Sequence, residues 1–150
     1  MKFMLMSAVS LLFSASVFAA EITKDQVTKL VDQTCKDISG GKADDVFKKI
    51  NASEAPYKDK TNQELYVFVY DKDVKMVAHA EKPSLVGQSY KGKPDVAGVN
   101  FRDLIVEGAL KNKSGWQDYM YQAPGQTGMK PKTTYYKLCK DYVVCAGMYK

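Results

Sequence analysis

The stretch from residue 65 to residue 90 constrains the fold most, and it begins with a strand that is apolar on both faces. Successive strand side chains point to opposite faces, so one face is aliphatic and the other aromatic: Leu65, Val67 and Val69, against Tyr66, Phe68 and Tyr70. Such a strand belongs inside a sheet covered on both sides. Turn-forming residues at 71–73 and a second run at 74–79 predict an antiparallel hairpin. We expect the aromatic face to form a pocket floor and the aliphatic face to hold a helix.

The chain opens with a segment typical of a secretory signal peptide. Met1 and Lys2 precede an apolar run over 3–18, and Val17 and Ala19 place small side chains around a cleavage site. We expect cleavage after Ala19, which leaves residues 20–150 as one exported domain, periplasmic or secreted. The alternative is a retained membrane anchor, but the run is shorter than the roughly 20 residues that a spanning helix needs. We therefore expect a protein that does not span the membrane.

Charge and composition exclude several classes of function. The net charge is +5, but the basic residues are interspersed with acidic ones and form no stripe for nucleic acid. A mild positive charge instead favours small anions as ligands. His79 is the only histidine and the sequence has no Cys/His ligand spacing, so we expect no metal site and no cofactor. The sequence also has no nucleophile motif with a base, and we do not expect an enzyme.

Three cysteines, Cys35, Cys139 and Cys145, predict one disulfide and one free thiol in an oxidising compartment. A two-residue turn at 140–141 would place Cys139 and Cys145 on opposite faces of a hairpin, which argues against a bridge between them. A longer loop would permit that bridge. The pairing therefore stays open.

The remaining segments predict an α+β domain. Thr23 with Gln26 resembles a capping box at the start of a first helix. A long irregular segment rich in glycine and proline follows the central hairpin, and such loops often bind ligands or act as lids. The expected ranges are 22–38 and 43–50 for two helices, 81–98 for the loop, 101–110 for a third helix, and 115–121, 133–139 and 142–149 for three strands. Short connections between most strands predict an antiparallel sheet.

Several motifs occur in a characteristic order: the strand and Asp-x-Asp turn over 66–73, His79 with 83–87, Phe101, 115–119 with Pro124, Pro131-Lys132 with Tyr135 and Lys137, and the closing run 142–149. In this order the chain resembles the single Cache domain, a PAS-like extracellular sensor module of bacteria, in its small one-lobed form. The resemblance implies a five-stranded antiparallel sheet with a long N-terminal helix packed behind it. It also implies a pocket on the other side, often for short carboxylates such as acetate, propionate, lactate or pyruvate.

A carboxylate pocket needs a few donors that converge in an apolar cavity, because a buried anion without partners is costly. Lys137 is the expected charge, with Lys132 as its substitute if Lys137 is only a surface lysine. His79, Tyr119 and Tyr121 are the expected hydrogen-bonding groups. His79 fits equally well as a satisfied histidine at a strand end.

The other candidate ligand-binding residues each have a structural alternative. Trp116 fits a pocket wall or an ordinary core anchor, and Phe68 and Phe101 fit the pocket lining or the core. Tyr135 shares a face of its strand with the expected lysine. Tyr90, in the irregular loop, fits a side chain that closes over the ligand or a surface tyrosine.

The expected function is that of a free-standing periplasmic module that binds or senses a small organic anion, with a membrane receptor or sensor kinase as a possible partner. The alternative is a protein-interaction module with a vestigial pocket that docks on a membrane signalling partner.

Overall fold

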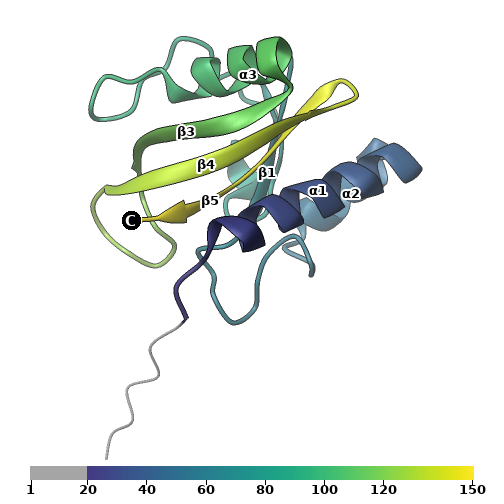
Figure 1. Ribbon diagram of the computed structural model, residues 1–150, viewed down its shortest axis with the longest axis horizontal. Helices are drawn as coiled ribbons and strands as arrows, with labels where there is room; N and C mark the ends of the chain where they lie inside the picture. The colour runs from purple at the N-terminus through teal and green to yellow at the C-terminus, as the bar shows by residue number, and fades with distance from the viewer. Residues whose placement is uncertain (1–19) are drawn as a thin grey trace, which may run out of the picture.

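The structure is a computed structural model that describes residues 20–150 (Figure 1). The expected signal peptide, residues 1–19, lies outside the described residues. Within 20–150, no helix is both long enough and apolar enough to cross a membrane.

One five-stranded antiparallel sheet forms the centre of the fold, as predicted, with the strand order β2-β1-β5-β4-β3. The strands are β1 (Val67–Asp71), β2 (Met76–His79), β3 (Ser114–Tyr121), β4 (Lys130–Cys139) and β5 (Tyr142–Tyr149). The apolar strand β1 pairs with β2 on one side and with β5 on the other. Burial of both its faces explains why it carries no polar side chain before Asp71.

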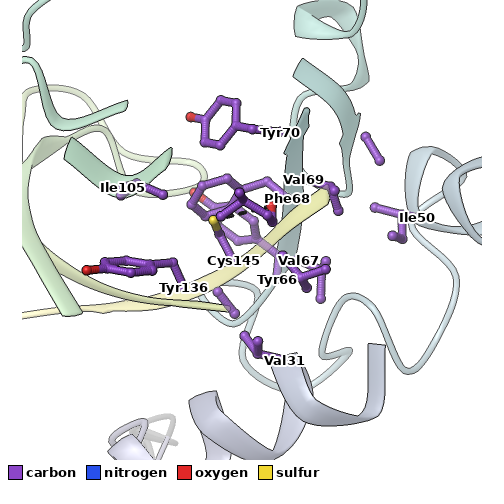
Figure 2. Packing of buried hydrophobic residues seen from close by; sticks show 14 of the residues in the cluster. Val31, Ile50, Tyr66, Val67, Phe68, Val69, Tyr70, Ile105, Tyr136 and Cys145 are labelled. Atoms are coloured by element: carbon purple, nitrogen blue, oxygen red, sulfur yellow. Dashed lines mark hydrogen bonds between the residues drawn. The ribbon is translucent and has the colours of Figure 1, made fainter. Parts of the chain in front are cut away.

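Two helices cover the aliphatic face of β1. They are α1 (Lys24–Gly40), which starts with the predicted capping box of Thr23 and Gln26, and α2 (Ala43–Asn51). Val31 and Ile50 lie on the side of β1 that carries Val67 and Val69 (Figure 2). These apolar contacts fix the back of the sheet.

The hairpin between β4 and β5 has the predicted two-residue turn, with Cys139 opposite Tyr142. Cys139 and Cys145 therefore face opposite sides, and Cys139 pairs instead with Cys35 of α1. The bridge joins residues 104 positions apart in the sequence and ties α1 to the sheet. Cys145 is a buried free thiol on the other face.

The front of the sheet is covered by α3 (Phe101–Asn112) (Figure 1). The short 3-10 turn η1 (Pro83–Leu85) lies beside the edge strand β2, and the irregular loop leads from it to α3. Ile105 of α3 is fully buried on the front side (Figure 2). The ring of Tyr136 in β4 fits between Gly108 of α3 and Gly115 of β3, where a Cβ on either glycine would overlap its hydroxyl end. These glycines allow α3 to pack closely on the edge of the sheet.

Candidate functional site

An aromatic chamber lies between the front of the sheet and α3. Its eight lining residues are Tyr66, Phe68, Tyr70, His79, Phe101, Tyr119, Tyr121 and Lys132. The volume of this cavity that is open to the centres of water molecules is about 10 Å³, which holds about one water. We name this cavity the chamber.

The alternation of the strands assembles the chamber. Phe68 and Tyr70 of β1 and Tyr66, the residue before it, point to the interior of the chamber, and His79 pairs with Phe68 across the β1–β2 ladder. In the β3–β4 ladder Tyr119 pairs with Lys132, so both face the same way. Phe101, the first residue of α3, stacks on Tyr119 with ring centroids 3.8 Å apart and closes the opposite wall.

Lys132 is the cation of the chamber, and it is 1% exposed. Its Nζ donates a hydrogen bond to Tyr66 Oη at 2.7 Å and lies 4.2 Å from the centroid of that ring. The rings of Phe68, Tyr121 and Tyr149 surround the same nitrogen at 4.8 to 5.3 Å. No carboxylate between residues 20 and 150 forms an ion pair with it. Burial lowers the pKa of Lys132 to about 7, because the apolar surroundings disfavour its charged form.

His79 is held as a neutral ring beside Lys132. Its Nδ1 accepts hydrogen bonds from the backbone N–H groups of Glu81 and Lys82, at 3.2 and 2.9 Å. The remaining proton is therefore on Nε2, which is left as a donor towards the chamber. Burial, and then the charge of Lys132, lower the pKa of His79 to about 3.

Hydroxyl groups extend the polar network beyond the chamber. Tyr66 Oη lies 3.2 Å from Tyr149 Oη, and Tyr149 donates to the carbonyl of Gln122 at 2.9 Å. Tyr119 Oη lies 2.9 Å from Thr134 Oγ1. The chamber thus offers an ammonium and an imidazole N–H within aromatic walls, which is a suitable arrangement for a small anion.

A more open hollow adjoins the chamber, and we name it the vestibule. It has about 250 Å³ open to the centres of water molecules and shares Phe101 and Tyr121 with the chamber. Its other lining residues are Pro94, Asp95, Val96, Arg102, Met120 and Met129. The carboxylate of Asp95 accepts hydrogen bonds from the backbone N–H groups of Ala97, Val99 and Met120, which pins the irregular loop to the edge strand β3.

A larger groove, of about 610 Å³, lies between α1, α2 and the segment that follows α2. Lysines and acidic side chains alternate along its walls, and it is open to solvent. It has no enclosed charge comparable to Lys132, so we take the smaller chamber as the candidate site.

The structure brings five of the predicted ligand-binding residues together in the chamber: Phe68, His79, Phe101, Tyr119 and Tyr121. Tyr90 does not line it. The Tyr90 ring packs under the guanidinium of Arg102, 4.5 Å away, and its hydroxyl donates to Gln88.

The structure does not bring the other three predicted residues into the chamber: Trp116, Tyr135 and Lys137 point to the opposite face of the sheet. Each is an odd number of positions from Tyr119 or Lys132 on its own strand, and an odd step reverses the face. Lys137 forms a 2.6 Å ion pair with Asp32 of α1. Trp116 and Tyr135 pack against each other with centroids 5.3 Å apart. The charge in the chamber is therefore Lys132, the substitute considered above.

Tyr66 and Tyr70 line the chamber as part of the aromatic face expected to form the pocket floor, although neither was among the candidate ligand-binding residues, and Arg102 was not anticipated. The signal for both tyrosines was present, because they share a face with Phe68 in a strand already assigned. Arg102 stacks on Phe101 at 4.2 Å and lines the vestibule. Its position depends on the angle at which α3 meets the sheet, and no local pattern reveals it.

A match to a protein-family model identifies the family of this chain. Its sequence matches the family model of single Cache domain 2 over residues 5–149. The chain belongs to this family. Membership confirms the resemblance inferred from the order of motifs, and the α+β sheet described above is the PAS-like Cache fold. No curated protein matches this Cache domain.

Several solved structures share this fold. One, described as the periplasmic sensor domain of a chemotaxis protein, is 27% identical with a TM-score of 0.63, over 81% of this chain and 86% of that one. A methyl-accepting chemotaxis protein from Vibrio parahaemolyticus is 20% identical with a TM-score of 0.71, over 84% and 87% of the two chains. A Cache chemosensory domain described for its carboxylic acid recognition is 17% identical with a TM-score of 0.68, over 83% and 91%.

Proposed function

We propose that this Cache domain is a periplasmic sensor that binds a short carboxylate, of the acetate, propionate, lactate or pyruvate type, in the aromatic chamber. The observation that carries the proposal is Lys132, an almost fully buried lysine whose only hydrogen-bond partner among the described residues is a neutral hydroxyl. A buried ammonium without an anion is costly, and a carboxylate ligand would supply the missing charge. The related domain that recognises carboxylic acids supports this choice.

Each part of the chamber has a role in this proposal. Lys132 pairs with the carboxylate, and His79 Nε2 donates a second hydrogen bond to it. The rings of Phe68, Phe101 and Tyr119 contact the short carbon chain and exclude water, which strengthens both polar contacts.

The size of the chamber restricts the ligand. The empty space holds about one water, so a carboxylate of two or three carbons can enter only if a wall moves. Phe101 and Tyr121 separate the chamber from the vestibule and are the side chains that would give way. We propose that the ligand enters from the vestibule, and that the resulting movement is read by a membrane receptor or sensor kinase.

The first prediction concerns binding. At pH 6 we expect one or more of acetate, propionate, lactate and pyruvate to raise the melting temperature, with about 2.7 kcal/mol of stabilisation at 100 times the Kd. Lys132→Met should remove the effect, because it removes the charge that pairs with the ligand. Lys137→Met is the matched control on the opposite face and should bind as the wild type does. Thermal shift followed by calorimetric titration measures both.

The small volume of the chamber also favours a second candidate, a protein-interaction module with a closed pocket. The same titrations distinguish the two. Stabilisation by a carboxylate that requires Lys132 supports the sensor. No stabilisation by any of the four carboxylates at 10 mM, or loss of binding in Lys137→Met but not in Lys132→Met, contradicts it.

A further inference from the structure

No carboxylate among residues 20–150 forms an ion pair with Lys132, although the charges of Glu64 and Glu81 raise its pKa from further away. The titratable or charged side chains that share the chamber with Lys132 or influence it are Tyr66, Tyr70 of β1, His79 of β2, Tyr119 and Tyr121 of β3, Cys145 and Tyr149 of β5, and Glu64, Glu81 and Lys82 of the connecting loops. Arg102 of α3 and Lys58 act on the neighbouring His79.

The groups in direct reach of Lys132 Nζ are uncharged near neutral pH. Burial raises the pKa of the Tyr66 hydroxyl and of the Cys145 thiol well above their usual values, so neither supplies a negative charge. His79 is neutral as well, because its pKa is about 3. Glu81, the acid on the neighbouring loop, is engaged by Lys58 at 2.5 Å.

These surroundings make the charge on Lys132 conditional. In the absence of an anion, a buried ammonium among aromatic rings and hydroxyls is destabilised relative to the neutral amine. When a carboxylate enters, the ion pair favours the ammonium instead. The charge on the lysine should therefore differ between the free and the bound protein.

We infer that binding of a carboxylate in the chamber is coupled to uptake of one proton by Lys132. The site then gains both an anion and a proton, which together correspond to the neutral carboxylic acid. This inference rests on the proposed function. The neutral amine accepts a proton from solvent, the carboxylate enters as the anion, and an ammonium–carboxylate pair results. Charge balances, and no bond other than N–H is formed.

The coupling predicts a specific dependence of affinity on pH. Because the pKa of Lys132 in the free protein is about 7, the Kd should be nearly constant between pH 5.5 and 6.5 and should rise about tenfold per pH unit above 7.5. His79 does not contribute to this range because it remains neutral throughout. The second prediction is therefore a rise in Kd of roughly 100-fold between pH 6 and pH 9.

Calorimetric titration tests the coupling directly. Acetate, propionate, lactate and pyruvate are the probes, each titrated at pH 6 in phosphate and in Bis-Tris and at pH 8 in phosphate and in Tris, because the two buffers of each pair differ in their heats of ionisation. For the carboxylates that bind at pH 6, we expect uptake of about 0.9 proton at pH 8 and about 0.1 at pH 6. Lys137→Met should show the same uptake, because its side chain lies on the opposite face.

Nuclear magnetic resonance of protein labelled at lysine Cε gives a second readout. One lysine, assigned by its absence in Lys132→Met, should titrate near neutral pH without ligand and above pH 9 with it. Binding with a Kd that is unchanged from pH 6 to pH 9, and with heats independent of buffer, would overturn the coupling but leave the sensor proposal standing. Absence of binding at pH 6 by all four carboxylates would overturn both.

Discussion

His79 shows how one buried side chain links the chamber to stability. Its Nδ1 holds the backbone of residues 81 and 82, where the irregular loop leaves β2. Protonation of Nδ1 would break both hydrogen bonds and place a second cation beside Lys132. The fold therefore keeps this ring neutral, and the start of the irregular loop depends on that state.

The third prediction follows from the pKa of His79. In the folded state it is about 3, against 6.5 as the ordinary value. The unfolded chain therefore binds more protons between these two values, and stability is complete above pH 6.5 and falls as the pH drops towards 3. We expect the wild type to lose about 2 kcal/mol more of unfolding free energy than His79→Gln between pH 7 and pH 4.5. Urea denaturation at the two pH values measures the difference, and equal losses would contradict the account.

Lys132 and Lys137 show which part of the site could be predicted from single residues. Alternation along a strand correctly indicates that two residues five positions apart face opposite ways. It does not say which face α1 covers. Lys137 is paired with Asp32 of α1, and that contact depends on how a distant helix crosses the sheet. A lysine on this strand facing a pocket was therefore predictable, but which of the two lysines faces the chamber was not.

The elements were predicted best where local patterns decide them. The capping box of α1 and the turn between β4 and β5 each depend on residues close in sequence, and both were confirmed. The start of β4 was placed three residues too late. Lys130 belongs to the strand because Tyr121 of β3 pairs with it, and this pairing depends on the conformation of the loop between the strands. Lys132 was left outside the expected strand for the same reason.

Close packing of α3 on the sheet gives the fourth prediction. Ala is normally favoured over Gly within a helix by up to about 1 kcal/mol. At Gly108, however, the added Cβ would overlap the hydroxyl end of the Tyr136 ring, which is itself buried against β3. We expect Gly108→Ala to lower the free energy of unfolding by about 1 to 3 kcal/mol.

Gly40→Ala is the control for this change. Gly40 is also helical, but no atom lies within 4 Å of its added Cβ. Denaturant titration should show this variant to be as stable as the wild type or more so. A Gly108→Ala protein that is as stable as Gly40→Ala would show that α3 does not depend on close contact with Tyr136.

In the molecule as a whole, the two faces of the single sheet differ: the back is fixed in place, and the front carries the candidate site. The back is fixed by α1 and α2, the ion pair of Lys137 with Asp32, and the disulfide between Cys35 and Cys139. The front is covered by α3 (Figure 1) and carries the chamber, which Phe101 at the start of α3 lines. A strand that is buried on both faces, β1, connects the two.

The most direct test of the central claim is a crystal structure of the protein with the tightest-binding of the four carboxylates. The account predicts electron density for the ligand within the chamber, with a carboxylate oxygen about 2.7 to 2.9 Å from Lys132 Nζ and with Phe101 or Tyr121 displaced. Density for the ligand beside Lys137 or in the groove between α1 and α2, with the chamber still closed, would contradict it.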